Sequence, residues 1–302
     1  MDNLILTVEK KFNTKVKNVF PCGKGATASC YYVETIDFPY TLVVKSSLHY
    51  DLMHEEMQMN KFLKDRVSFK IAEMYFFEKC DNKTYLGMEY IQGISGRDLR
   101  LYQIKNKKHL CDNILKCFMN MQSVHNNKFG PYNNAVYLSW NEYYWDFFRR
   151  IYEFAHKKYK NKELDIITID ALEYIKVNFN EIFTDTSKIA SISHGDFWAP
   201  NMIFNVEKSE LAGVVDPFNT RFVEPEYELF CLTLGLGKKL NLYKKYKKIN
   251  QVSKYCDLKV ELYALCNELD WWMHLGEIDT IGYIKMRSKR LIRQMKKHKL
   301  KR

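Results

Sequence analysis

The hydrophobic pattern of the chain changes near residue 92, and this change limits the folds open to it. Before that point, β-branched and aromatic residues form short apolar runs separated by turn residues, at positions 16–20, 30–35, 40–44, 71–77 and 84–91. One helix is expected among these strands, over residues 48–63, because Leu52, Met59 and Phe62 recur at helical spacing.

From residue 93 onward the spacing is mainly helical. Helices are predicted over residues 97–103, 109–126, 140–160 and 163–183, and again beyond residue 227. A loop-rich, strand-containing segment at 192–223 interrupts them. The predicted fold class is therefore α+β, with a small β-rich lobe over residues 1–92 and a larger helical lobe over residues 93–302. A cleft between two such lobes is a common place for a small-molecule site.

The positive charge lies at one end of the chain. The 302 residues include 47 Lys and Arg against 36 Asp and Glu, a net charge of +11. Residues 285–302 hold ten of the basic residues and no acid, so the rest is nearly neutral. Charge confined in this way does not indicate a nucleic-acid substrate for the body of the protein. Apolar residues spaced among these cations predict a basic amphipathic helix. Its simpler interpretation is a solvated helix end, and docking on an anionic membrane or on RNA is the alternative.

The cysteines and the chain start bear on the cellular compartment. The eight cysteines include no C-x-x-C pair, which disfavours a zinc site or a disulfide framework and favours reduced thiols. The first residues do not resemble a secretory signal, and no uncharged apolar run approaches the ~20 residues of a membrane span. A soluble, cytoplasmic protein is expected.

The segment at 192–223 carries the candidate catalytic groups. It contains His194-Gly195-Asp196, then Asn201, and Asp216 follows 15 residues after Asn201. Carboxylate and amide oxygens beside apolar strand-like segments are suited to Mg²⁺ bound with nucleotide phosphates. A separate Asp can orient a substrate hydroxyl and take its proton during phosphoryl transfer. An ordinary polar turn is the alternative interpretation.

The spacing His-Gly-Asp-x-x-x-x-Asn, followed by an Asp in an apolar strand and by Glu-Pro-x-x-Glu-Leu at 224–229, resembles the aminoglycoside phosphotransferase family. This family is a branch of the two-lobed protein-kinase-like fold, and the resemblance extends over residues 15–235. It implies that Asp196 is the catalytic base and that Asn201 and Asp216 hold Mg²⁺ against the phosphates of ATP. It also implies that His194 supports the loop and that Glu228 is a structural anchor.

A glycine-containing loop and a lysine in the N-terminal part fit the same family. Gly23, Gly25 and Thr27 lie in a G-x-G-x-x-A loop between two predicted strands. Glycines allow the backbone to approach phosphates closely, although a plain hairpin turn is the alternative. Lys45 ends a predicted strand, where kinase-like folds place the lysine that contacts the nucleotide phosphates.

Two further nucleotide contacts are implied by the resemblance. The lysine's partner is expected to be a helix glutamate, and Glu55 is favoured over Glu56 because it lies beside the predicted inward face of residues 48–63. Residues 85–93 resemble the family's hinge, in which the backbone of Glu89 to Ile91 would bind adenine.

The acceptor is less constrained than the nucleotide. Residues 197–200, which include Trp198, and Pro217 both depart from the common pattern of the family, and an Asp-Pro pair also occurs in fructosamine-kinase-like relatives. Two segments combine acids with aromatic residues, and they suit a cationic amine or amino-sugar. The candidate acceptor contacts are Trp198, Glu142, Asp146, Glu268 and Asp270. The alternative is that the tryptophans belong to the core and the acids are solvated.

These patterns predict an ATP- and Mg²⁺-dependent phosphotransferase that acts on a hydroxyl of an amino-sugar, an aminoglycoside or a related polar alcohol. The alternative is a kinase-like binding protein without catalysis, whose basic tail docks on RNA or a membrane. A protein kinase is disfavoured, because the chain has no Asp-Phe-Gly or Ala-Pro-Glu segment.

Overall fold

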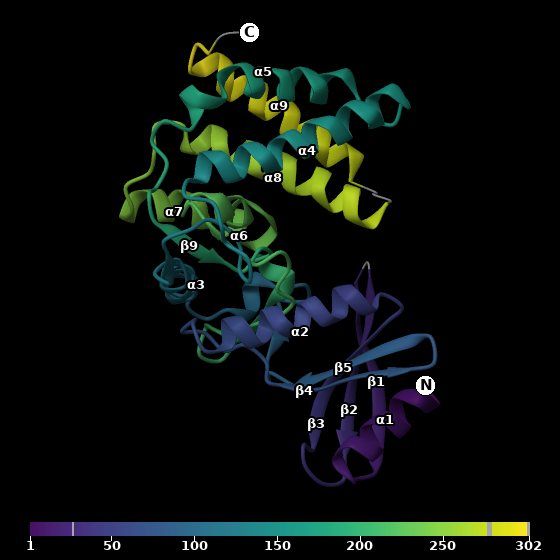
Figure 1. The fold of residues 1–302 in the computed structure, drawn as a ribbon. Coiled ribbons are helices and arrows are strands. Elements are labelled where there is room, and N and C mark those ends of the chain that lie inside the picture. The colour runs from purple at the N-terminus through teal and green to yellow at the C-terminus, as the bar shows by residue number, and fades with distance from the viewer. Residues whose placement is uncertain (26, 277–279, 301–302) are drawn as a thin grey trace. The chain divides into compact units, whose positions relative to one another are not determined.

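The computed structural model describes residues 1–25, 27–276 and 280–300. The chain divides into two compact units, each made of two segments (Figure 1). Unit 1 comprises residues 1–121 and 199–220, and unit 2 comprises residues 122–198 and 221–302. The predicted α+β class is confirmed, since strands dominate the N-terminal region and helices the C-terminal region. The lobe boundary after residue 92 stays a prediction.

Unit 1 is built on a five-stranded antiparallel sheet with the strand order β1-β2-β3-β5-β4. Its strands are β1 (Val16–Lys24), β2 (Ala28–Thr35), β3 (Thr41–Ser47), β4 (Met74–Cys80) and β5 (Lys83–Glu89). Each overlaps a run that the sequence predicts as a strand. Helix α2 (Tyr50–Lys64) matches the helix predicted over residues 48–63, whereas the sequence patterns do not predict α1 (Asp2–Phe12).

The two helices cover opposite faces of this sheet. Leu4 of α1 packs in one apolar cluster with Val44. Met53 of α2 packs in another with Leu86 of β5. Because successive side chains of a strand point to opposite faces, Lys45 faces the α2 side, where its cross-strand partner Leu86 also lies.

A second sheet in unit 1 has the order β11-β10-β6 and consists of β6 (Ile94–Ser95), β10 (Met202–Asn205) and β11 (Glu210–Val214). A backbone hydrogen bond of 2.9 Å from Val214 N to Lys70 O joins it to the segment before β4. Other elements of unit 1 are η1 (Leu101–Gln103), α3 (Lys107–Gln122) and η2 (Ala199–Asn201).

The helix predicted over residues 97–103 is wrong except for the single turn η1. The preceding residues are held in strand β6, and the chain passes very close to another backbone at Gly96. A Cβ at this position would lie 1.9 Å from the carbonyl oxygen of Ala199. The local helical spacing is therefore overruled by strand pairing and by this close approach.

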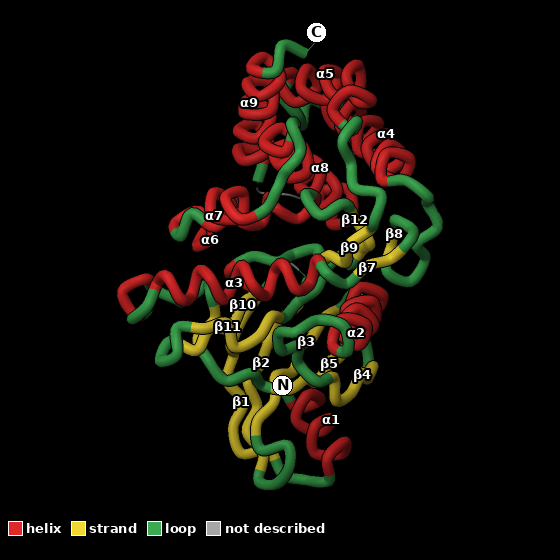
Figure 2. Tube along the Cα trace, turned by 90° about the vertical axis from the view of Figure 1, so that its left-hand side faces the viewer, coloured by secondary structure: helices red, strands yellow, loops and turns green. Residues whose placement is uncertain are grey.

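Unit 2 combines a small sheet with a group of long helices (Figure 2). The sheet has the order β7-β9-β12-β8 and consists of β7 (His125–Asn126), β8 (Gly130–Pro131), β9 (Ala190–Ser193) and β12 (Arg221–Val223). The helices are α4 (Trp140–Lys160), α5 (Ile166–Ile182), α6 (Gly235–Lys239), α7 (Leu242–Ile249), α8 (Cys256–Leu275) and α9 (Ile281–Lys297), with the 3₁₀ segment η3 (Tyr227–Thr233). The predicted bounds of α4 are confirmed, and Ser139 caps this helix by accepting the Glu142 amide at 3.2 Å.

Helix α9 is the predicted basic amphipathic helix. Its apolar residues Ile284, Leu291 and Met295 are buried, and the helix packs against α5 and α8. Its apolar side is thus used inside unit 2, and the charges of the tail that fall on residues 301–302 lie outside the described residues. Within the described ranges, no helix has the length and apolar character needed to cross a membrane.

Candidate active site

Lys45 is the centre of a buried charge cluster in unit 1. Its Nζ lies 2.5 Å from Glu56 Oε1 and 2.7 Å from Asp216 Oδ1. The lysine side chain is 8% exposed, whereas the side chain of Asp216 is 51% exposed. Burial lowers the pKa of Lys45, but the charges of Asp216 and Glu56 raise the pKa by more than burial lowers it. The net pKa is therefore raised, and the lysine stays charged. The cluster therefore has one closed side at Glu56 and one open side at Asp216.

The choice of Glu55 as the partner of Lys45 was wrong. Glu55 is exposed, and Glu56 is buried and bonded to the lysine. The buried stripe of α2 contains Met53, Glu56, Met57, Asn60 and Leu63, which recur at helical spacing. The stripe that predicted Glu55 consists of Leu52 and Phe62, which are half-buried, and of Met59, which is buried. Met53 and Met57, the other two methionines of α2, lie on the face that carries Glu56.

The environment of Glu56 is unusual for a carboxylate. Burial raises its pKa to about 7; Lys45 lowers the pKa, and the charge of Asp216 raises it. Two carboxylates thus compete for one ammonium group. A cation that neutralises Asp216 from its open side relieves this competition.

The two predicted metal ligands lie on adjoining backbone segments of unit 1. The amide of Val215 donates to the carbonyl oxygen of Asn201 at 2.9 Å, and Asp216 follows directly. Asp216 has a left-handed φ of 63°, which is rare for a residue with a side chain and often marks a functional position. An amide oxygen and a half-exposed carboxylate fit Mg²⁺, which takes few protein oxygens and completes its shell with phosphates and water.

The glycine-containing loop joins β1 to β2 near Lys45. Gly23 pairs with Cys30, which in turn pairs with Lys45 on β3. The amide of Gly25 donates to Ala28 at 2.8 Å, and the hydroxyl of Ser47 donates to the carbonyl oxygen of Thr27 at 2.6 Å. Ala26, within the predicted motif, lies outside the described residues. The loop is therefore fixed at both ends to the strands that carry the cluster.

The predicted hinge follows β5. The Glu89 carboxylate is paired with Lys70 at 2.5 Å, so its side chain is engaged. Ile91 is buried with Met53 of α2 in the same apolar cluster. Among residues 1–25, 27–276 and 280–300, no backbone partner is found for the Ile91 amide. A buried apolar wall beside a main-chain donor suits a flat heterocycle.

The loop that carries Asp196 belongs to unit 2 and is held by one buried carboxylate. Glu228 accepts hydrogen bonds from the amides of His194 at 3.0 Å, Gly195 at 2.7 Å and Phe197 at 3.2 Å. Burial raises the pKa of Glu228 to about 8; the three amides lower it, and the charge of Asp196 raises it. The expected anchoring role of Glu228 is confirmed. Asp196 itself is half-buried between two anchored residues.

The candidate acceptor acids of unit 2 differ in burial and in hydrogen-bond partners. Asp270 is 2% exposed and pairs with Arg221 at 3.4 Å, so its prediction as a substrate contact was wrong. Asp146 accepts the hydroxyl of Tyr137 at 2.9 Å, and Glu268 accepts that of Thr280 at 2.7 Å.

Glu142 is exposed and Trp198 is half-buried, and both stay candidate acceptor contacts. The tryptophans of the two acceptor segments, residues 140–146 and 268–272, differ in burial: Trp145 is 36% exposed and Trp271 is half-buried. Trp140 is 1% exposed and Trp272 is 4% exposed, so these two belong to the core of unit 2.

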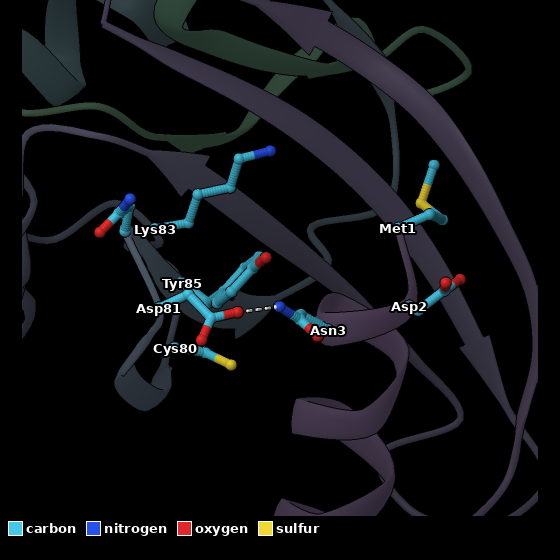
Figure 3. A pocket seen from close by; sticks show the side chains of 8 residues that line it. Met1, Asp2, Asn3, Cys80, Asp81, Lys83 and Tyr85 are labelled. Carbon is cyan, nitrogen blue, oxygen red and sulfur yellow. Dashed lines mark hydrogen bonds between the residues drawn. The ribbon is translucent and has the colours of Figure 1, made fainter.

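A cavity of about 310 Å³ lies between the start of α1 and the turn from β4 to β5 (Figure 3). Tyr85 lines it and belongs to the apolar cluster on the α1 side of the sheet. Since Lys45 faces the α2 side, the cavity is on the opposite face of the sheet from the charge cluster. None of the predicted site residues lines it.

Comparison with known proteins identifies the class. The phosphotransferase enzyme family (APH) matches residues 19–240, and the chain belongs to this family. The resemblance inferred from the motifs is thereby confirmed, and membership makes the protein a small-molecule kinase. No curated protein sequence matches the chain significantly.

Solved structures confirm the kinase-like fold at low sequence identity. A thermostable mutant of aminoglycoside phosphotransferase APH(4)-Ia, in a ternary complex with ADP and hygromycin B, is similar with a TM-score of 0.74 and 15% identity, covering 97% of this chain and 98% of that one. A putative fructosamine-3-kinase from Thermobifida fusca YX-ER1 has a TM-score of 0.70 and 16% identity, covering 97% and 99%. The gentamicin complex of APH(2")-IIa has a TM-score of 0.58 and 15% identity, covering 100% and 97%.

Proposed function

We propose that this protein transfers the γ-phosphoryl group of ATP, bound with Mg²⁺, to a hydroxyl group of a small molecule. The observation that carries the proposal is the cluster of Lys45, Glu56 and Asp216. A charged lysine held by a buried glutamate, next to a carboxylate open to solvent, is suited to a nucleotide phosphate on one side and a metal ion on the other.

The nucleotide would be held by unit 1. Lys45 is kept charged and oriented by Glu56, and it would contact the phosphates nearest the nucleoside. The backbone of Gly23, Gly25 and Thr27 would approach the phosphates from the loop, and the backbone from Glu89 to Ile91 would bind adenine. The ADP-containing neighbour supports a nucleotide as ligand of this fold.

A bound Mg²⁺ would neutralise charge on the transferred phosphoryl group, with Asn201 and Asp216 as its protein ligands. Asp196 would accept the proton of the acceptor hydroxyl as the oxygen attacks phosphorus. The three amides that donate to Glu228 fix the loop on both sides of Asp196. Little reorganisation of this loop would therefore be needed when the acceptor binds.

An amino-sugar, an aminoglycoside or a related polar alcohol is the proposed acceptor. The neighbours whose names include hygromycin B, gentamicin or fructosamine support this range. Glu142, Asp146, Glu268 and Trp198 stay the candidate contacts, whereas Asp270 is buried and paired with Arg221 inside the fold. A cytoplasmic location is part of the same proposal.

Replacing Asp196 by Asn tests the reaction. A screen of amino-sugars, ketosamines, aminoglycosides, nucleosides and choline-like alcohols would first identify an acceptor by Mg²⁺-dependent consumption of ATP. We expect the variant to lose transfer by about 10²–10⁴-fold, the usual contribution of a general base. ADP binding, measured by calorimetry, should stay unchanged, and equal turnover by the variant would refute the role of Asp196.

The alternative is a protein that binds a partner through its basic tail without catalysis. The burial of the apolar side of α9 within unit 2 argues against insertion of this helix into a membrane. Truncation after residue 284 would remove the buried Leu291 and Met295 as well as the charges. Charge reversal at the exposed Lys289, Lys296 and Lys297 is therefore the better test, because salt-sensitive binding to RNA or vesicles should then disappear if the tail docks.

A further inference from the structure

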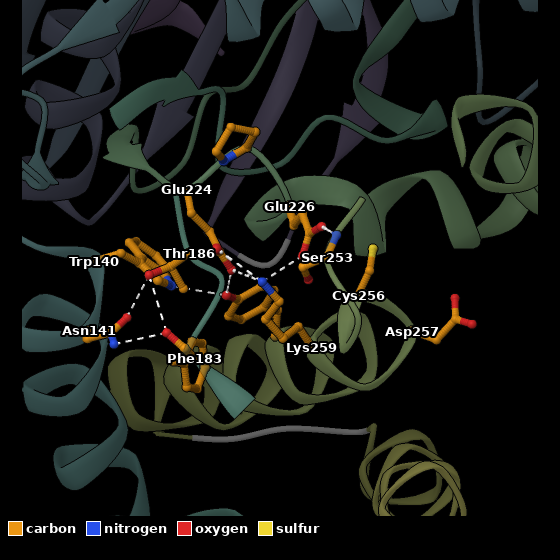
Figure 4. Close-up of polar contacts among 12 residues, drawn as sticks. Trp140, Asn141, Phe183, Thr186, Glu224, Glu226, Ser253, Cys256, Asp257 and Lys259 are labelled. Atoms are coloured by element: carbon orange, nitrogen blue, oxygen red, sulfur yellow. Dashed lines mark hydrogen bonds and ion pairs between the residues drawn. The ribbon is translucent and has the colours of Figure 1, made fainter. Parts of the chain in front are cut away.

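A second buried lysine, Lys259 on α8, lies in a polar network of unit 2 (Figure 4). Its Nζ is 3.1 Å from a carboxylate oxygen of Glu224 and 2.6 Å from Glu226 Oε2. The lysine side chain is 1% exposed, and those of Glu224 and Glu226 are 2% and 11% exposed. One cation thus pairs with two carboxylates that flank Pro225.

The network has partners on several other elements. The Tyr263 hydroxyl donates to Glu224, and the indole of Trp140 on α4 donates to Tyr263 at 3.0 Å. Glu226 accepts both the amide of Ser253 at 2.5 Å and its hydroxyl at 2.7 Å. The residues drawn in Figure 4 therefore connect α4, α8 and the chain before α8 to one short segment, residues 224–226.

That segment leads directly to the anchor of the Asp196 loop. Backbone hydrogen bonds join Tyr227 N to Glu224 O at 3.0 Å and Leu229 N to Glu226 O at 3.3 Å, so the start of η3 continues from the two glutamates. Glu228 lies in the sequence between Tyr227 and Leu229, and its carboxylate accepts hydrogen bonds from the amides of residues 194, 195 and 197. These hydrogen bonds thus link Glu224 and Glu226, through one short turn, to Glu228 and the loop that it holds.

We propose that Lys259 is a positioning residue for phosphoryl transfer: through Glu224 and Glu226 it fixes the start of η3, and thereby the Glu228 carboxylate that sets the position of Asp196. This inference rests on the proposed function for its catalytic consequence, but the mechanical link is a property of unit 2 alone. Charged hydrogen bonds in a low-dielectric interior are strong and directional, so a lysine shared by two carboxylates is suited to fix a turn.

The mechanical link is tested by hydrogen exchange, which needs no substrate. In Lys259→Met, peptides that span residues 190–198 should exchange at least tenfold faster than in the wild type, because the amides bonded to Glu228 lose their fixed acceptor. Peptides of β3 and β5 in unit 1 should be unchanged. The matched control is Lys248→Met, which removes an exposed lysine of α7 and should leave both regions unchanged.

The catalytic consequence is tested by steady-state kinetics on the same variants. In Lys259→Met, kcat should fall at least tenfold while the KM for ATP stays within twofold of the wild-type value, because the proposed nucleotide contacts lie in unit 1. If Lys259→Met does not fold, Lys259→Arg keeps the charge but changes its geometry. This variant should show the same split, with a melting temperature close to that of the wild type.

Three results decide the inference. Wild-type exchange over 190–198 in folded Lys259 variants overturns it, and so does wild-type kcat with faster exchange, since the loop would then move without affecting transfer. A wild-type protein that consumes no ATP with any acceptor refutes the proposed function, not the mechanical link. In that case faster exchange over 190–198 still supports Lys259 as the residue that holds the loop.

Discussion

The two units each contain a buried lysine between two carboxylates, and the two clusters differ in what is open to solvent. In unit 1, the Asp216 side chain is 51% exposed beside a lysine that is 8% exposed. In unit 2, no member of the Lys259 cluster has a side chain more exposed than the 11% of Glu226. An open carboxylate can exchange its lysine for a metal ion, whereas a closed cluster can only hold its neighbours in place.

The difference teaches how to separate binding from support. In both lysines, burial lowers the pKa and the neighbouring carboxylates raise it by a larger amount. The net shift is upward in both, so its direction does not distinguish them. The backbone conformation around each cluster distinguishes the two lysines. Asp216 has a left-handed φ of 63° and sits between strands, whereas Glu224 and Glu226 flank a proline at the start of a 3₁₀ segment. We therefore expect substitutions at Lys45 to affect rate and those at Lys259 to affect stability as well as rate.

The largest expected effect is that of Lys45→Met on the rate. Removing one preorganised charge from a phosphate site usually lowers kcat by about 10²–10³-fold. The melting temperature should fall less than in Lys259→Met, because Glu56 stays buried without its partner but the open Asp216 can be solvated once the lysine is gone. Steady-state kinetics and differential scanning fluorimetry on the same preparation measure both. A large loss of stability without loss of rate would show that the open cluster is the structural one.

Lys259→Met should have the next largest effect, on stability. Removing one partner of a buried ion pair destabilises a protein by about 3–5 kcal/mol, since the remaining charges stay buried without compensation. Chemical denaturation followed by tryptophan fluorescence measures the change. The triple variant Lys259→Met, Glu224→Gln, Glu226→Gln removes all three charges at similar volume, and it should recover most of the lost stability. Equal destabilisation by the single and triple variants would contradict this assignment.

The same comparison shows what the sequence alone reveals. The strands of unit 1 and helix α4 were predictable, because their apolar spacing is local and packing agrees with it. The order of Asp196, Asn201 and Asp216 was readable for the same reason, since one short segment carries all three. Membership in the phosphotransferase family confirms the resemblance that this motif indicated, and the roles of its three residues stay predictions.

Partner choice was not predictable, because it depends on packing between distant segments. Lys45 and Asp216 are 171 positions apart, and Lys259 and Glu224 are 35 apart. Glu55 and Glu56 are neighbours on one helix, and a rotation of about 100° decides which one is buried. The burial of Asp270, predicted as a substrate contact, could not be foreseen because its partner Arg221 comes from another element. In each case the charge was visible and its environment was not.

A matched pair on α2 sharpens the assignment in the open cluster. Glu56→Gln should lower the transfer rate by roughly tenfold, since a hydrogen bond to a charged group contributes about 1.5–3 kcal/mol and Lys45 loses part of its orientation. Glu55→Gln removes the same charge from an exposed position and should leave the rate unchanged. Rates at saturating ATP with the acceptor from the screen decide between them. A larger effect at Glu55 would contradict the observed ion pair.

The smallest expected effect is a pH dependence in the closed cluster. Burial raises the pKa of Glu224 above its usual value of 4.5; Lys259 lowers it, Glu226 raises it, and the net shift is upward. The folded protein therefore holds this proton more tightly than the unfolded chain does. The resulting stabilisation is complete below pH 4.5 and is lost as the pH rises through the pKa of the folded state. Glu224→Gln lacks this proton, so its melting temperature should rise relative to that of the wild type as the pH increases above 4.5. Other titrating groups are common to both proteins and cancel in the difference.

A difference in melting temperature that is flat or falls with pH would show that Glu224 ionises in the folded protein as easily as in the unfolded chain. The closed cluster would then resemble a solvated ion pair rather than a buried support.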